Sequence, residues 1–127
     1  MSVTLEKIVM QSLNIVKGKT DKTVSKSDII YCLMEAMGKN KSYIIANNDE
    51  VIGKNQLIKF NFMIDALKKG TPLAYVLGNQ FFYGYKYYVD HNVLIPRPET
   101  EIIISEIIKR GDKIYKPQES FNLIDAG

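Results

Sequence analysis

Apolar residues recur at helical spacing through the first seventy residues of the chain. The pattern predicts a first amphipathic helix over residues 4–17, with Gly18 as its end. A second helix is expected to begin at Ser25 or Ser27, since serine is a good N-cap residue, and to end at Gly38, where a left-handed residue is favoured.

Two further helices complete this region. Ser42 begins a short predicted helix that runs through Ala46, and residues 47–55 are predicted to form a loop. A longer helix runs from Asn55 to Gly70. The positions predicted to face inward are Leu5, Ile8, Val9, Leu13, Val16, Ile30, Leu33, Met34, Met37, Leu57, Phe60, Met63, Ile64 and Leu67. The first seventy residues are therefore interpreted as a small helical bundle.

The pattern changes after Gly78, where aromatic and β-branched residues crowd around Gly84. Strand formers on both sides of a glycine predict a β-hairpin. A run of tyrosines is also compatible with a platform on which the bases of single-stranded nucleic acid stack. Hairpin packing is the favoured interpretation, because no arginines are interleaved with the tyrosines.

A final helix and a strand are predicted beyond the hairpin. Pro96 and Pro98 hold Arg97 in extended backbone, and Pro98 suits the first position of a helix that should run to Arg110 and end at Gly111. The isoleucines expected to face inward are Ile103, Ile104, Ile107 and Ile108.

Residues 121–127 are predicted to form a short apolar strand that ends in Asp-Ala-Gly, the way nucleotide-binding α/β domains open. Because one strand cannot make a parallel sheet, we expect the sequence to be part of a longer protein. The fold class is therefore mainly α: a helical bundle, a β-hairpin linker, a helix and the first strand of a truncated Rossmann-like α/β domain.

Composition and charge exclude several functional classes. The formal net charge is +3, from 17 Lys and Arg against 14 Asp and Glu without a long basic block, so direct nucleic-acid binding is not expected. No signal peptide or membrane-spanning segment is evident, and a cytoplasmic protein is the default expectation.

Neither the one cysteine nor the one histidine suggests a reactive centre. Cys32 lies among apolar residues and is interpreted as a buried packing thiol. His91 is expected in a surface turn, and no cluster shows metal-ligand spacing.

Three stretches carry a family resemblance. Residues 70–78 read Gly-Thr-Pro-Leu-Ala-Tyr-Val-Leu-Gly, residues 82–84 read Phe-Tyr-Gly, and residues 93–101 read Val-Leu-Ile-Pro-Arg-Pro-Glu-Thr-Glu. Their order and spacing, followed by Asp-Ala-Gly at residues 125–127, resemble the linker signature of the HemK/PrmC family of protein-(glutamine) methyltransferases. Before Gly70 only the helical character agrees.

The resemblance implies a two-domain enzyme that transfers a methyl group from S-adenosylmethionine to the glutamine of the Gly-Gly-Gln loop in class 1 peptide-chain release factors. It implies a helical substrate-recognition domain over residues 1–72, a hairpin linker over 73–97, and the start of the methyltransferase domain over 98–127. A sister family that methylates a ribosomal protein usually reads Pro-Arg-Ser-Pro where this chain reads Pro96-Arg97-Pro98-Glu99, so the release-factor branch is favoured.

The same resemblance gives candidate site residues. The family's Asn-Pro-Pro-Tyr motif, which orients the substrate amide, is absent, so no catalytic residue is assigned and the chain alone is expected to be inactive. Gly127 and Asp125 match the start of the cofactor loop. Arg97, Glu99 and Thr100 are expected to shape the cofactor pocket, or else to have only a structural role at the start of a helix.

Two other interpretations remain open. In the first, the chain is a free-standing helical adaptor or a nucleic-acid-binding module whose lysines contact phosphates. A ribosomal-protein glutamine methyltransferase, or another methyltransferase on a similar scaffold, is also compatible with a sequence that lacks the substrate-orienting motif.

Overall fold

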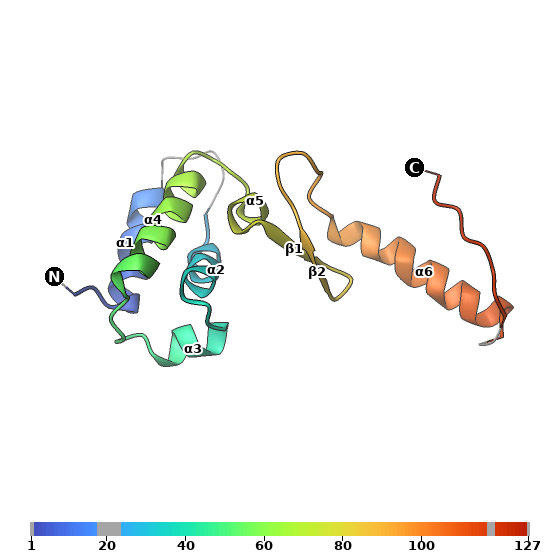
Figure 1. The fold of residues 1–127 in the computed structure, drawn as a ribbon, viewed down its shortest axis with the longest axis horizontal. Helices are drawn as coiled ribbons and strands as arrows, with labels where there is room; N and C mark the ends of the chain where they lie inside the picture. Colours follow the sequence, from blue (N-terminus) through green and yellow to red (C-terminus); the bar gives the residue numbers. More distant parts are fainter. Residues whose placement is uncertain (1, 18–23, 117–118, 127) are drawn as a thin grey trace.

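The structure is a computed structural model that describes residues 2–17, 24–116 and 119–126. A helical bundle forms one end, a two-stranded hairpin lies in the middle, and a long helix extends away at the other end (Figure 1). In chain order the elements are α1 (Leu5–Val16), α2 (Lys26–Met37), α3 (Lys41–Ala46), α4 (Lys54–Lys68), α5 (Leu73–Leu77), β1 (Asn79–Phe82), β2 (Tyr85–Tyr88) and α6 (Pro98–Ile114).

The first four helices bury one shared apolar core, as the sequence pattern predicts. Helix α4 packs against α1 and α2, and α3 packs against α2. Phe60 of α4 is 1% exposed, and Leu33 and Cys32 of α2 are completely buried. Burial of one such side chain contributes roughly 1.5–3 kcal/mol, so this core is what stabilises the bundle.

The predicted inward positions are confirmed almost throughout. Leu13, Met34 and Leu57 are only partly buried but pack against the core, and the other predicted positions are buried. The periodicity missed Ile29, which is fully buried, and Ile52, which lies in the predicted loop and is 6% exposed.

Helix ends follow the expected capping chemistry. The Ser25 hydroxyl accepts a hydrogen bond from the backbone N–H of Asp28, and the Asp28 carboxylate accepts one from the Ser25 N–H, so Ser25 rather than Ser27 is the N-cap of α2. Gly38 ends α2 at a φ of 63°, as predicted. Helix α3 begins at Lys41, slightly before the predicted Ser42, because the Asn40 side chain caps it.

The start of α1 is capped by a distant segment of the chain. Thr4 provides no side-chain cap. Instead the N–H of Leu5 donates to the carbonyl of Glu50 at 3.0 Å, and the N–H of Glu6 donates to the carbonyl of Asn48 at 2.9 Å. The predicted loop therefore satisfies donors that the first turn of a helix leaves unpaired. The predicted stop of α1 at Gly18 lies outside the described residues.

Helix α5 was not predicted from the sequence. Residues 73–77 were assigned to the hairpin linker, yet they form a short helix whose Leu73, Val76 and Leu77 pack against the bundle core. The hairpin therefore starts from an element that is already fixed on the bundle.

The predicted hairpin is confirmed. Strands β1 and β2 are antiparallel, with Phe82 opposite Tyr85 beside the turn and Asn79 opposite Tyr88 at the far end. The two turn residues, Tyr83 and Gly84, both have positive φ, of 49° and 79°. This backbone is typical of the tight type I′ turns that join twisted strands. Every residue of β2 is exposed. The rings of Phe82 and Tyr87 nevertheless make an edge contact across the hairpin, with their centroids 6.2 Å apart.

Two expectations about α6 are corrected. The helix does not end at Gly111 but continues to Ile114, and Gly111 does not have a positive φ. No α6 residue is buried, so the expected inward isoleucines have no core to enter. Helical periodicity identifies the apolar face of a helix but does not supply the surface that covers it.

The strand predicted at residues 121–127 is also not formed as a paired strand. Residues 119–126 are exposed and have no regular secondary structure, and Gly127 lies outside the described residues. A strand needs a hydrogen-bonding neighbour, and in the described part of the chain the only sheet consists of β1 and β2. Within the same residues, no helix is long and apolar enough to cross a bilayer.

Replacing Ser25 with alanine should destabilise the bundle by about 1 kcal/mol, because the hydroxyl that accepts the Asp28 N–H is lost. Ser27→Ala is the matched control, since Ser27 lies in the first turn of the same helix and is exposed. Urea denaturation followed by circular dichroism measures both free energies of unfolding. Equal losses in the two variants would contradict the capping assignment.

The Cys32 thiol should react far more slowly with iodoacetamide at pH 8 in the folded chain than in the chain unfolded by urea. Burial, with a smaller effect of the Asp28 carboxylate, raises the pKa of Cys32 from 9.0 to about 12. Because the pKa of Cys32 is higher in the folded chain than in the unfolded chain, the thiol does not change the free energy of unfolding below pH 9.0. As the pH rises from 9.0 towards about 12, the unfolded chain loses this proton first and the free energy of unfolding falls. Rapid labelling of the native chain, measured by mass spectrometry, would show that the thiol is accessible.

Candidate functional site

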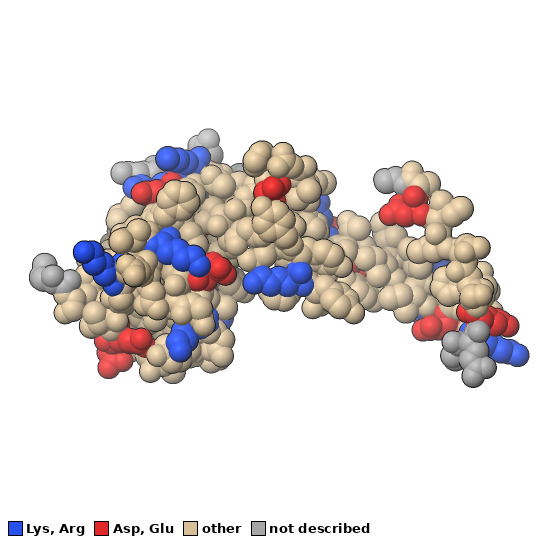
Figure 2. All heavy atoms as spheres, viewed as in Figure 1, with Lys and Arg blue, Asp and Glu red and all other residues tan. Residues whose placement is uncertain are grey.

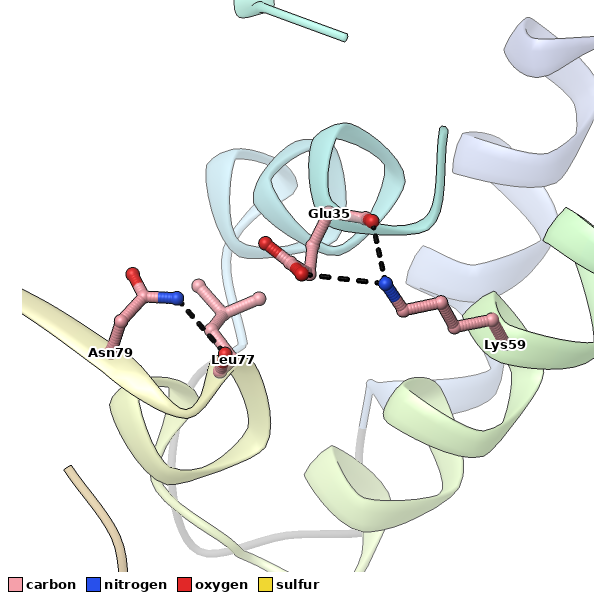
Figure 3. Close-up of polar contacts among 4 residues, drawn as sticks. All are labelled: Glu35, Lys59, Leu77 and Asn79. Atoms are coloured by element: carbon pink, nitrogen blue, oxygen red, sulfur yellow. Dashed lines mark hydrogen bonds and ion pairs between the residues drawn. The ribbon is translucent and has the colours of Figure 1, made fainter. Parts of the chain in front are cut away.

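The hairpin is attached to the bundle through hydrogen bonds on both sides of its open end. The Val89 N–H donates to the carbonyl of Gly78 at 3.1 Å, and the Val89 side chain is only 2% exposed. The Asn79 side chain donates to the carbonyl of Leu77 at 2.9 Å, at the point where α5 passes into β1 (Figure 3). These contacts fix the base of the hairpin on α5.

The segment after β2 returns to α5. The phenolic hydroxyl of Tyr75 donates to the carbonyl of Val93 at 2.6 Å. Asp90 organises the turn before it, because its carboxylate accepts the N–H of Asn92 at 2.8 Å and its carbonyl accepts the N–H of Val93. The Asn92 N–H is the main reason that the pKa of Asp90 lies below its usual value. His91 is exposed in this turn, where the sequence placed it.

The tip of the hairpin contacts the start of α6. The backbone N–H of Tyr83 donates to the carboxylate oxygen Oε1 of Glu101 at 2.7 Å. Pro98 occupies the first turn of α6, and its fixed φ suits that position. The glutamate therefore bridges two elements whose contacting residues are 18 positions apart in the sequence.

The cofactor residues predicted from the sequence are exposed. Arg97 is the N-cap residue of α6 without a side-chain capping bond, and its carbonyl accepts the N–H of Thr100 at 3.1 Å. Glu99 and Thr100 are exposed in the first turn of that helix, and Asp125 is exposed on the segment that follows it. Gly127 lies outside the described residues. Their role at a cofactor remains a prediction.

These residues do not fit a cofactor pocket by themselves. Methyl transfer needs an environment from which water is excluded, whereas Arg97, Glu99, Thr100 and Asp125 all face solvent. Glu99 was singled out from the sequence as a pocket-shaping residue, yet it is Glu101, in the same turn, that makes the contact between elements. The sequence motif does not distinguish Glu101 from Glu99 as the contact residue, because local spacing does not reveal a hydrogen-bond partner such as the Tyr83 N–H in a distant turn.

Helix α6 carries an apolar face that the described residues cover only in part. Ile102, Ile103 and Ile114 are each at least 60% exposed. The segment after the helix runs back beside its second half, where Phe121 and Leu123 line a hollow together with Ile107. The rings of Tyr115 and Phe121 stack with their centroids 4.6 Å apart.

The bundle surface carries scattered charges. Lysines and carboxylates are interspersed over the face shown in Figure 2, without a single basic stripe among the residues drawn in colour. Lys59 of α4 pairs with the Glu35 carboxylate at 3.3 Å and donates to the Glu35 carbonyl at 2.9 Å (Figure 3). Both side chains are exposed, so this pair contributes little to stability.

The described residues contain no group of three or more His, Cys, Asp and Glu side chains that could hold a metal ion. Cys32 is fully buried in the bundle core, as expected of a packing thiol.

Comparison with known proteins identifies the bundle. The family described as PrmC N-terminal domain matches residues 22–78, which extend from before α2 to the residue that ends α5. The N-terminal part of the bundle, including α1, lies outside this match.

Several curated relatives carry the name release factor glutamine methyltransferase. The Bacillus subtilis (strain 168) protein is 32% identical over 95 residues, which cover 75% of this chain and 33% of the relative. The protein of Mycoplasma mycoides subsp. mycoides SC is 35% identical over 109 residues, which cover 84% of this chain and 38% of the relative. The Francisella tularensis subsp. tularensis protein is 29% identical over 126 residues, which cover 99% of this chain and 43% of the relative.

The chain thus spans about a third to two fifths of the length of these relatives. The family match includes α2 to α5 and the first of the three linker motifs, at residues 70–78. The chain belongs to the HemK/PrmC family of protein-(glutamine) methyltransferases, of which it represents the N-terminal portion.

Proposed function

We propose that this chain is the substrate-recognition part of an S-adenosylmethionine-dependent enzyme that methylates the Gly-Gly-Gln glutamine of class 1 peptide-chain release factors. In this proposal residues 1–72 form the recognition domain, residues 73–97 the linker and residues 98–127 the beginning of a methyltransferase domain. The whole protein acts in the cytoplasm, and this chain alone is inactive.

The observation that carries the proposal is the family match over residues 22–78, together with relatives that are named for this activity. The exposed apolar face of α6 also supports it, since a soluble protein rarely leaves such a face without a partner surface. Further residues of a longer protein would cover this face and complete a cofactor pocket beside Arg97, Glu99 and Thr100.

The required chemistry explains why catalysis is assigned outside this chain. An amide nitrogen is a poor nucleophile, so the enzyme must hold the substrate amide in line with the methyl group and exclude water. No enclosed site of this kind is built by the exposed candidates Arg97, Glu99, Thr100 and Asp125. The described residues form a packed bundle that can bind a protein. The contact between the hairpin turn and α6 can orient that bundle relative to the rest of the enzyme.

The outer face of α4 is the recognition surface that we favour for the release factor. Ile58 and Phe62 lie one turn apart on this helix and are 61% and 78% exposed. Two large apolar side chains exposed one turn apart form a small apolar patch that a partner protein can cover. Lys54 and Lys69 are also exposed at the two ends of α4, which favours a partner surface that is apolar with acidic residues at its edge.

The alternative of a nucleic-acid-binding module rests on the hairpin tyrosines, since Tyr85 and Tyr88 are 68% and 78% exposed. Lys86 is the only basic residue within β1 and β2, so little positive charge accompanies the rings. Binding driven by phosphates weakens steeply with added salt, whereas binding at an apolar surface does not.

The activity is tested with the whole protein and a recombinant class 1 release factor. Mass spectrometry of the peptide that contains Gly-Gly-Gln should show one added methyl group when S-adenosylmethionine is present. A release factor with the glutamine replaced is the control. An unmodified wild-type peptide would refute the proposed activity, and methylation of a ribosomal protein instead would favour the sister family.

Calorimetry on this chain tests recognition separately. We expect salt-tolerant binding of the release factor and no measurable binding of S-adenosylmethionine. Phe62→Ala should weaken release-factor binding by about 1 kcal/mol or more, the range of interface anchors. Asn61→Ala is the matched control, because Asn61 is the exposed neighbour of Phe62 on α4. Equal affinities of the two variants for the release factor would show that this face of α4 is not the recognition surface.

A further inference from the structure

The turn of the hairpin leaves one backbone donor without a partner in the ladder. Strand pairing ends at Phe82 and Tyr85, so the N–H of Tyr83 points out of the two-stranded sheet. Tyr83 also has a φ of 49°, a left-handed conformation that residues other than glycine, asparagine and aspartate rarely adopt. The Tyr83 N–H is therefore free to donate to an acceptor outside the hairpin.

Glu101 provides that acceptor. Its Oε1 atom accepts the Tyr83 N–H at 2.7 Å in a partly buried position. Hydrogen bonds to a carboxylate are shorter and stronger than those between neutral groups. The carboxylate comes from the first turn of α6, so the bond joins the far end of the hairpin to a helix that follows it in the chain.

The other contacts between α6 and the rest of the described chain are weak. None of its residues is buried, and within the described residues it has no extensive packing against the bundle helices or the hairpin strands. The hairpin, in contrast, is held to α5 through Val89 and Gly78, and α5 is packed on the bundle. Helix α6 follows the hairpin and lies away from the bundle (Figure 1). Its position relative to the bundle therefore depends on residues 89–97 and on the bond between Tyr83 and Glu101.

We propose that Glu101 is a positioning residue, whose carboxylate holds α6 against the hairpin turn and so sets the orientation of α6 relative to the helical bundle. The consequence for catalysis rests on the proposed function. A release factor bound to the bundle would reach the methyl donor only if the two parts of the enzyme keep one orientation, so Glu101 would act on the protein substrate without touching it.

Distances between spin labels on this chain test the orientation directly. Labels at Asn61→Cys on α4 and Ser105→Cys on α6 are both on exposed positions. The buried Cys32 should remain unlabelled. Pulsed electron paramagnetic resonance should give a narrow distance distribution that broadens in Glu101→Ala. Glu101→Gln should restore most of the narrow distribution, because its amide oxygen still accepts the Tyr83 N–H.

Glu99→Ala is the matched control for the distance measurement, since Glu99 is an exposed carboxylate in the first turn of the same helix. It should leave the distribution narrow. In parallel, the Tyr83 amide proton should exchange with solvent about tenfold faster or more in Glu101→Ala, as expected when a hydrogen bond to a charged group is lost. An unchanged distribution in Glu101→Ala, or equal broadening in Glu99→Ala, would overturn the proposal.

The whole enzyme provides a second readout. Glu101→Ala should raise KM for the intact release factor by about tenfold or more and leave kcat for a short Gly-Gly-Gln peptide unchanged, with Glu101→Gln near wild type. Equal losses on both substrates would overturn the positioning role in catalysis. If the unsubstituted enzyme methylates neither substrate, the proposed function fails, and the distance measurement still decides whether Glu101 sets the orientation.

Discussion

The packing of α2 against α4 is the contact on which the other parts of the structure depend. Leu33 and Cys32 from α2 and Phe60 from α4 belong to one core cluster, in which these side chains are almost completely buried. Helix α5 packs on the same core, and the hairpin in turn begins at α5. A cavity in this core would therefore also destabilise the attachment of the hairpin, because in the described chain the base of the hairpin is held by α5, which packs on this core.

The contacts that hold each element change in kind from the bundle towards α6. The bundle is held by buried apolar area, which does not depend on the geometry of any single pair of atoms. The hairpin is attached by a few hydrogen bonds and the buried Val89 side chain. Helix α6 is attached by a backbone segment and one carboxylate. The direction of the helix is consequently determined by polar contacts, which are short and directional but few.

The sequence was sufficient for features that depend on local spacing and insufficient for those that depend on distant partners. The inward stripe of α4 and the left-handed Gly38 follow from the helical period and from backbone sterics. Helix α5 was missed because five residues with Pro72 before them show no full helical period. Glu101 was missed as a contact residue because its partner is the backbone of Tyr83, and a backbone donor leaves no trace in the side-chain pattern.

The capping of α1 by residues 48–50 has a consequence for the order of events during synthesis. A helix of this length is marginal in isolation, and Leu5 and Glu6 donate to carbonyls that emerge from the ribosome more than forty residues later. The first helix is therefore not completed when its own residues have been made. Those two N–H groups find their partners only once residues 48–50 are in place, so we expect the start of α1 and the segment before α4 to become ordered together.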